Sequence, residues 1–309
     1  MSQGDLLREL TGEHQEVVNN GMPPAAARRR RTSVARSTQR LRALPQGRSD
    51  LDLIQIRDPE LAFEDLLLPA ELRQLFAEVH LEHRREDLLV HHGIAPRRTF
   101  LFVGPPGCGK SATAEALADE LGRPLATVNL STVVSSFLGD TAKNLASIFA
   151  AAGRESWVVL FDEFDAIGKE RAEGSDHGEL KRIVTAFLQD LDGFVGPSIL
   201  VAATNHPALL DLAVWRRFNE VIAFEPPQVH DIRALLRLKL KPIRREPGLK
   251  IEEVASACRG LTHADVSGVV TDAYRRHLLY EPDAPLRTEE LLAAAQAAQR
   301  RTSASHAAS

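Results

Sequence analysis

Gly104-Pro105-Pro106-Gly107-Cys108-Gly109-Lys110-Ser111 is the most informative stretch of this 309-residue chain. It follows the β-branched and aromatic run Thr99–Val103 and precedes a helical pattern over Ser111–Leu121. Its spacing fits the phosphate-binding motif GxxxxGK[ST], which requires a strand before it and a helix after it. Glycines let backbone N–H groups turn inward around a β-phosphate, and the helix adds its positive N-terminal end. The stretch therefore predicts a site for a nucleoside triphosphate.

Three side chains of this motif have separate expected roles. Lys110 would neutralise the β- and γ-phosphates and the Ser111 hydroxyl would ligate Mg²⁺, which makes ATP and Mg²⁺ the expected cofactors. Cys108 is either a small residue that fits the loop or an oxidisable thiol whose pKa is lowered by the phosphate cradle and the helix N-terminus.

A second element supplies carboxylates. The run Trp157–Phe161 is predicted to be a buried strand, and it ends in Asp162 and Glu163. Asp162 would hold Mg²⁺ through its water shell, and Glu163 would polarise the attacking water as a general base. The alternative is a strand that ends in a solvated acidic turn. The pair favours a hydrolase over a protein that only binds nucleotide.

Up to Phe224 the chain alternates short apolar runs with helical patterns. Strands that are apolar on both faces and separated by helices are typical of a parallel sheet covered on both sides. We therefore predict an α/β domain at residues 58–225 with a five-stranded parallel sheet. The expected strands are Thr99–Val103, Leu125–Asn129, Trp157–Phe161, Ile199–Ala203 and Val221–Phe224, and the clearest helices are Ser111–Leu121, Asn144–Ala152 and Leu180–Leu191.

After Pro226-Pro227 the strand patterns stop. The remaining apolar spacing predicts a small domain at residues 226–300, followed by a disordered tail at 301–309. Its four expected helices are 229–241, 251–259, 263–279 and 288–300.

The formal net charge of −4 is unevenly distributed. Residues 24–48 contain eight arginines and no acidic residue, so the rest of the chain sums to −12. Blocks of like charge near a terminus are usually disordered tails. Residues 1–57 are therefore predicted to form a basic, mobile arm that contacts nucleic acid, an acidic surface or nothing.

Cellular location is inferred from cysteine use and hydropathy. Cys108 and Cys258 show no pairing or zinc-binding spacing, which fits a reducing compartment. No apolar run is long enough to span a bilayer, so we expect a cytoplasmic protein without a membrane partner. Arginine outnumbers lysine by 31 to 7, an association with GC-rich bacterial genomes.

The motifs and their order resemble those of the AAA ATPases within the AAA+ group. Asp162–Arg171 resembles the extended Walker B pattern, Ala203–Pro207 resembles sensor 1, and Leu210–Phe218 resembles the arginine-finger region. The resemblance runs from about Phe63 to Arg300. It implies a P-loop NTPase fold with a small C-terminal helical lid.

The resemblance also implies roles and an assembly. Asn205 would hydrogen-bond the γ-phosphate or the lytic water, although an Asn after a strand is often a turn former. Arg216 and Arg217 would reach the ATP of a neighbouring subunit, which requires head-to-tail contacts and implies a homo-oligomeric ring of six. Asp192-Gly193-Phe194 resembles a motif that senses the neighbour's nucleotide and is equally an ordinary helix stop.

For the base of ATP, the resemblance implies contacts at two segments. Phe63–Leu66 resembles the segment whose backbone contacts adenine, through Asp65 and Leu66. Gly260–Asp265 resembles the start of a lid helix that faces the nucleotide, with Ala264 at the contact. His263 stands where the family most often has Gly. The nucleotide-binding residues implied are Gly104, Pro105, Pro106, Gly107, Cys108, Gly109, Lys110, Ser111, Ala112, Asp65, Leu66 and Ala264.

Between the second and third strands, Ser135–Asp140 resembles the pore loop that lines the channel of such rings. Phe137, Leu138 and Gly139 would form its tip and grip an extended polypeptide, since an aromatic ring packs on any backbone. The alternative is that the Phe-Leu pair packs in a core. A second pore element, at Glu173–Gly178, equally fits a connecting loop.

Two functions of different classes follow. The first is an ATP-driven ring that remodels, unfolds or threads a protein substrate with a separate partner such as a peptidase or adaptor, since the chain has no HExxH motif. The second is a nucleic-acid-associated AAA+ loader or switch tethered through Arg28–Arg48. ATPase stimulation by DNA or RNA that falls steeply with salt would distinguish them. A third reading, a nucleotide-dependent scaffold with little turnover, is disfavoured by the intact catalytic motifs.

Overall fold

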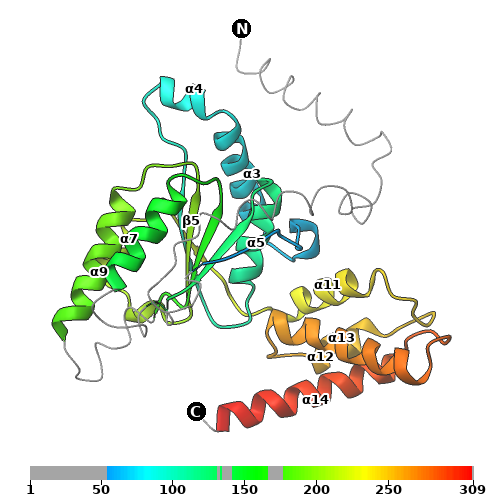
Figure 1. Cartoon of the computed structure of the whole chain (residues 1–309). Helices are drawn as coiled ribbons and strands as arrows, with labels where there is room; N and C mark the ends of the chain where they lie inside the picture. The colour runs from blue at the N-terminus through cyan, green and yellow to red at the C-terminus, as the bar shows by residue number, and fades with distance from the viewer. Residues whose placement is uncertain (1–53, 131–132, 134–140, 166–176, 308–309) are drawn as a thin grey trace. The chain divides into compact units, whose positions relative to one another are not determined.

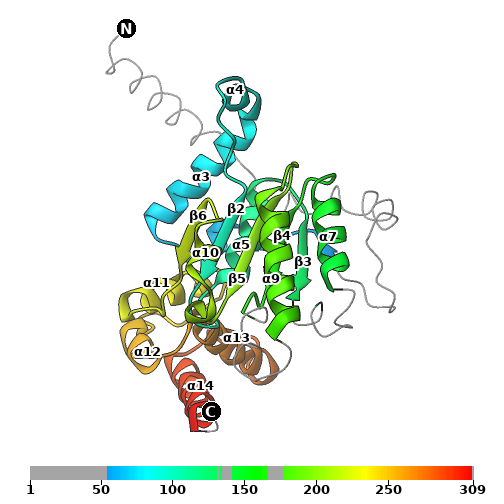
Figure 2. The same ribbon diagram turned by 90° about the vertical axis from the view of Figure 1, so that its left-hand side faces the viewer.

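A six-stranded sheet forms the centre of the N-terminal part of this computed structural model, which describes residues 54–130, 133, 141–165 and 177–307 (Figures 1 and 2). The spatial order of the strands is β1-β3-β4-β5-β2-β6. The P-loop therefore follows a strand that lies inside the sheet. The strands are β1 (Gln55–Arg57), β2 (Thr99–Val103), β3 (Leu125–Asn129), β4 (Val158–Asp162), β5 (Ile199–Thr204) and β6 (Glu220–Ala223).

The five predicted strands are present and parallel, from β3 through β4, β5 and β2 to β6. The sixth strand, β1, pairs antiparallel with β3 and lies within the segment 1–57 that was predicted to be a mobile arm. The sheet therefore has one strand more than the five that were predicted. A three-residue strand has no alternation long enough to detect, and β1 is held by the free edge of β3 and by the burial of Ile54.

Helices cover both faces of the sheet because successive strand residues point to opposite sides. Helices α7 (Thr141–Ala152) and α9 (His177–Asp192) pack on the face that includes Leu101. Helices α3 (Ala70–Arg84) and α5 (Lys110–Glu120) pack on the other face, which includes Phe100 and Phe102. Figure 2 shows α7 and α9 in front of the strands. This three-layer arrangement confirms the predicted α/β class.

Short elements complete the N-terminal part. The 3-10 turn η3 (Phe63–Asp65) precedes α3, and the short helix α4 (Glu86–His91) follows α3. A second 3-10 turn, η4 (Pro207–Leu209), and the short helix α10 (Leu212–Trp215) connect β5 to β6.

Four helices follow β6, as predicted (Figure 1). They enclose a separate apolar core that includes Leu236, Val269 and Leu291. The last helix continues to Ala307, where a disordered tail was predicted from residue 301; neither Gly nor Pro occurs between Leu291 and Ala307 to end the helix that the alanine-rich stretch favours. The helices are α11 (Val229–Leu240), α12 (Ile251–Ala257), α13 (His263–Tyr280) and α14 (Thr288–Ala307).

Several predicted features lie outside the described residues. These are the Arg-rich segment 28–48, the pore-loop tip Phe137, Leu138 and Gly139, and residues 173–176 of the second pore element.

Candidate functional site

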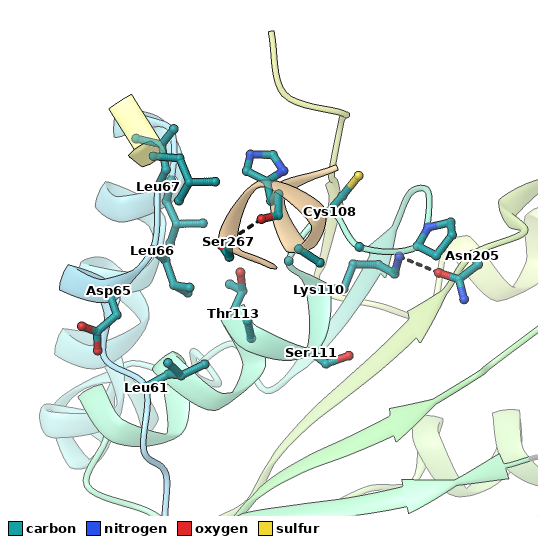
Figure 3. Close-up of a pocket in the computed structure, with 18 of the residues that line it drawn as sticks. Leu61, Asp65, Leu66, Leu67, Cys108, Lys110, Ser111, Thr113, Asn205 and Ser267 are labelled. Atoms are coloured by element: carbon teal, nitrogen blue, oxygen red, sulfur yellow. Dashed lines mark hydrogen bonds between the residues drawn. The ribbon is translucent and has the colours of Figure 1, made fainter. Parts of the chain in front are cut away.

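A cavity of about 480 Å³ opens at the carboxyl ends of the parallel strands (Figure 3). In open α/β sheets, ligands bind at this edge, where the strand order reverses. We distinguish two ends of the cavity. The phosphate end consists of Pro106–Thr113 with Asp162, Glu163 and Asn205, and the leucine end consists of Leu61, Leu66, Leu67, Leu68 and Leu235 with Lys239 and His263.

The backbone of the P-loop needs glycine at two points where other parts of the chain approach it. Gly104 has φ of 143°, and a Cβ there would lie 2.1 Å from the Phe224 carbonyl oxygen. Gly107 has φ of 74°, and a Cβ there would lie 2.5 Å from Thr262 Oγ1. The first contact packs the loop against the end of β6, and the second packs it against the start of α13.

Lys110 occupies the centre of the phosphate end. Its Nζ donates to the carbonyl oxygens of Gly104 (2.6 Å) and Pro105 (2.8 Å) and to Asn205 Oδ1 (2.7 Å). Burial lowers the pKa of Lys110, and the nearby carboxylates of Asp162 and Asp165 oppose that shift. The ammonium group is thus held among oxygen acceptors at the phosphate end of the cavity.

The carboxylates after β4 lie beside the start of α5. Ser111 Oγ donates to Asp162 Oδ2 at 3.2 Å, so the two residues that were predicted to hold Mg²⁺ are in contact. Glu163 lines the cavity and has φ of 54°, which makes it the single non-glycine residue with positive φ in the described ranges. Strained backbone of this kind persists where surrounding structure holds it and is common at active sites.

The Ser111–Asp162 pair fits Mg²⁺ in the number and type of its ligands. Mg²⁺ keeps several waters and takes few protein ligands beside substrate phosphates. In the part of the chain that the structure describes, no group of three or more His, Cys, Asp or Glu side chains could hold a metal.

Asp165 is a residue that the sequence analysis missed. Its carboxylate is almost fully buried, and Oδ1 accepts from Thr204 Oγ1 and from the Asn205 backbone N–H, both at 3.3 Å. It thereby holds the end of β5 next to the end of β4 and orients Asn205. Its position in the acidic stretch after β4 was the available signal, but only the fold shows that it faces β5.

Cys108 does not fit a reactive thiol. It is 5% exposed and packs in the apolar cluster between α5 and the sheet. Burial raises the pKa of Cys108, and the charge of Lys110 opposes this only in part. The predicted alternative of a lowered pKa is therefore contradicted, and Cys108 is a small residue that fits the loop.

The leucine end brings together three segments that are far apart in sequence. Asp65, Leu66 and Ala264, the three residues for which adenine contacts were predicted, all line the cavity. The Ala264 N–H donates to the Gly107 carbonyl oxygen at 3.0 Å, and Thr262 caps α13 by accepting from the Asp265 N–H at 3.2 Å. These bonds attach the start of α13 directly to the P-loop.

Two polar side chains accompany the leucines. Lys239, which the sequence analysis did not identify, donates from Nζ to the Asp65 carbonyl oxygen at 3.1 Å. His263 also lines the cavity; its Nδ1 is buried and has no hydrogen-bond partner among the described residues. Burial lowers the pKa of His263, so the imidazole is neutral near pH 7.

The two candidate arginines lie outside the cavity. Arg217 Nε donates to Asp192 Oδ2 at 2.7 Å, and its Nη1 donates to the Ala213 carbonyl oxygen at 2.9 Å. Arg216 is exposed at the end of α10. Neither is among the described residues that line the cavity.

A P-loop that follows the internal parallel strand β2, with the carboxylate at the end of β4 accepting from its serine, defines the class of P-loop nucleoside triphosphatases. Comparison with known proteins narrows the class. Residues 100–226 match the family model "ATPase family associated with various cellular activities (AAA)".

Related proteins extend this match. The chain is 32% identical over 305 residues to "Uncharacterized AAA family ATPase y4kL" of Sinorhizobium fredii, covering 90% of each chain. It is 32% identical over 237 residues to "ATP-dependent zinc metalloprotease FtsH 3" of Sphaerobacter thermophilus, covering 75% of this chain and 48% of the relative. It is also 32% identical over 206 residues to "Protein SAV" of Sulfolobus acidocaldarius, covering 65% of this chain and 26% of the relative. The chain thus spans about half the length of that FtsH relative and less of the SAV protein.

The chain belongs to the AAA ATPase family. It is accordingly an ATPase that uses ATP with Mg²⁺. Among the described residues, no helix has both the length and the apolar character that crossing a bilayer requires.

Proposed function

We propose that the chain is a subunit of a hexameric ring that uses ATP hydrolysis to remodel, unfold or thread a protein substrate. In the proposed site, the base of ATP occupies the leucine end of the cavity and the triphosphate occupies the phosphate end. The observation that supports a ring is that no arginine occurs among the described residues that line the cavity of one subunit. The two candidate arginine fingers, Arg216 and Arg217, lie outside that cavity on the same chain.

The hydrolytic roles follow from the distances at the phosphate end. Lys110 would exchange its bonds to the loop carbonyls and Asn205 for bonds to the β- and γ-phosphates. Ser111 would ligate Mg²⁺ directly, and Asp162 would hold it through water. Glu163 would take the proton of the attacking water, which Asn205 would help to orient.

Arg216 and Arg217 would act on the neighbouring subunit. An arginine that stabilises the charge of the phosphoryl-transfer transition state contributes about 10³–10⁵ in rate. Arg217 is paired with Asp192 in this structure, so it has to leave that carboxylate, 49% exposed, to reach another site. An ion pair with this exposure contributes little stability, which makes the exchange feasible.

Mixed rings test the arrangement. We expect the double variant Arg216→Ala/Arg217→Ala and the variant Glu163→Gln each to be inactive alone, while a mixture of the two recovers turnover. A double-variant subunit keeps an intact site and receives arginines from a Glu163→Gln neighbour, so random mixing activates up to about a quarter of the sites. Co-assembly without recovery would contradict arginines that act between subunits.

Protein substrates are proposed from the pore-loop pattern and from the FtsH relatives, which are named as ATP-dependent zinc metalloproteases. A separate peptidase or adaptor would act with this chain. Glu163→Gln protein in ATP should retain its substrate on affinity capture, and Phe137→Ala should keep basal ATPase activity but lose remodelling. Remodelling that survives Phe137→Ala would contradict threading through the pore.

A further inference from the structure

We infer that Glu115 is a positioning residue for the nucleotide cavity: it fixes the leucine end against α5 and thereby sets how tightly the base of ATP is held. The inference rests on the proposed place of the base at the leucine end. Glu115 lies on α5, one helical turn beyond Ser111, and it takes no part in the phosphate chemistry described above.

The Glu115 carboxylate accepts several hydrogen bonds from residues 57–61, the segment that leads into the leucine end. It is 5% exposed, and each of its oxygens accepts from the guanidinium of Arg57, at 2.8 Å and 2.6 Å. Oε1 also accepts from the backbone N–H groups of Glu60 (2.7 Å) and Leu61 (3.3 Å). Four donors thus converge on one buried carboxylate.

These bonds keep Glu115 charged. Burial alone would raise the pKa of Glu115, but the hydrogen bonds from Arg57 and from the backbone outweigh it, so the pKa lies below its ordinary value. A two-pronged guanidinium–carboxylate pair also fixes direction as well as distance. Arg57 is in β1, so the pair fixes that edge strand and the chain beyond it to α5.

The hydrogen bond from Leu61 connects Glu115 to the part of the cavity that is proposed to take the base of ATP. Leu61 is the first residue of the leucine end, and its own backbone N–H is one of the four donors. Further along, Arg73 donates to the carbonyl oxygens of Leu66 (3.0 Å) and Leu68 (3.2 Å), and Lys239 donates to that of Asp65. Hydrogen bonds therefore fix the segment 61–68 at both of its ends, and Glu115 accepts the bond at its first residue.

The test is Glu115→Gln, which keeps the shape of the side chain. An amide has one acceptor oxygen and one NH₂ group, so in either orientation its NH₂ group meets a donor from which the carboxylate accepts. We expect affinity for a fluorescent ATP analogue to fall about tenfold, as loss of a charge-assisted hydrogen bond implies, with turnover at saturating ATP within about twofold. Affinity for inorganic triphosphate, which occupies only the phosphate end, should stay unchanged.

Glu120→Gln is the matched control on the same helix. Its carboxylate is exposed and bonds only to His80 among the partners that the structure gives it, so ATP affinity should remain that of the parent. If Glu115→Gln does not fold, Arg57→Ala replaces it, because it removes the guanidinium and leaves the buried carboxylate its two backbone donors. Thermal unfolding of each variant measures the purely structural effect.

The outcomes are distinguishable. Equal losses of ATP and triphosphate affinity, or a lower melting temperature with unchanged affinities, would overturn the inference and leave Glu115 a structural residue. If the parent protein binds ATP no more tightly than triphosphate, the leucine end does not take the base and the proposed arrangement fails first. Selective loss of ATP affinity in Glu115→Gln alone supports the positioning role.

Discussion

The two ends of the cavity are built in opposite ways. At the phosphate end, eight consecutive residues, Gly104–Ser111, and the ends of two neighbouring strands supply the functional groups. At the leucine end, side chains from η3 and its flanks, α11 and α13 meet only because the C-terminal helices fold back onto the P-loop. The groups proposed to act on the phosphates are therefore local in sequence, whereas the proposed recognition of the base depends on long-range packing.

The largest effect is expected at the phosphate end, from Glu163→Gln. Loss of a general base should lower turnover by about 10²–10⁴-fold, with ATP affinity nearly unchanged because the amide keeps the shape of the carboxylate. Phosphate release and binding of a fluorescent ATP analogue measure the two quantities. Glu225→Gln, an exposed carboxylate that does not line the cavity, is the control. Turnover within threefold of the parent would reject Glu163 as the base.

Lys110→Ala is expected to weaken binding at the same end. Charged hydrogen bonds are worth about 1.5–3 kcal/mol each, so ATP affinity should fall by about 10–150-fold. Inorganic triphosphate should lose affinity by the same factor, because in the proposed site the phosphates are the only part of ATP that Lys110 contacts. Lys250→Ala, an exposed lysine of the C-terminal helices, serves as control. A much smaller loss for ATP than for triphosphate would mean that the two ends are not independent.

The contrast between the ends also explains which features could be predicted from sequence. The P-loop, β4 with Asp162 and Glu163, and the helices that were predicted follow from local spacing. Their bounds agree with the structure to within a few residues, except that α14 continues to Ala307. Lys239 carries no local signal, and the acidic stretch that contains Asp165 does not show that its side chain faces β5. Both roles depend on partners that are distant in sequence, in η3 for Lys239 and at the end of β5 for Asp165. The strand β1 was missed for the same reason: three residues become a strand only through pairing with β3.

A smaller effect is expected at the leucine end, from Lys239→Met. The variant keeps an unbranched side chain and removes the bond to the Asp65 carbonyl oxygen. We expect ATP affinity to fall by about three- to tenfold, in line with one hydrogen bond of about 1 kcal/mol, and triphosphate affinity to stay unchanged. Lys241→Met removes an exposed lysine of the same segment that does not line the cavity. Equal losses in both lysine variants would show a general charge effect instead.

The smallest effect concerns His277, a buried residue of α13 remote from the phosphates. Its Nδ1 lies 3.0 Å from Glu290 Oε1, and its Nε2 lies 2.8 Å from the Ala284 carbonyl oxygen. Both partners accept hydrogen bonds, so only the imidazolium, which has two N–H groups, can donate to both. Burial alone would lower the pKa of His277, but the bonds to Glu290 and Ala284 and the charge of Glu281 outweigh it and raise the pKa.

A raised pKa in the folded state gives stability that is fully present below the unfolded value near 6.5 and is lost as pH rises through the folded value. As the pH rises above about 6.5, the melting temperature should therefore fall more in the parent than in His277→Gln, and differential scanning calorimetry of both proteins across this range measures the difference. Because α13 begins at the cavity, ATP affinity should weaken over the same range by less than about threefold, while triphosphate affinity follows only the titration of the phosphate itself. Identical pH profiles of the melting temperature in parent and variant would contradict a stabilising role of protonated His277. An equal loss of triphosphate affinity would show that loosening of the C-terminal helices affects both ends of the cavity.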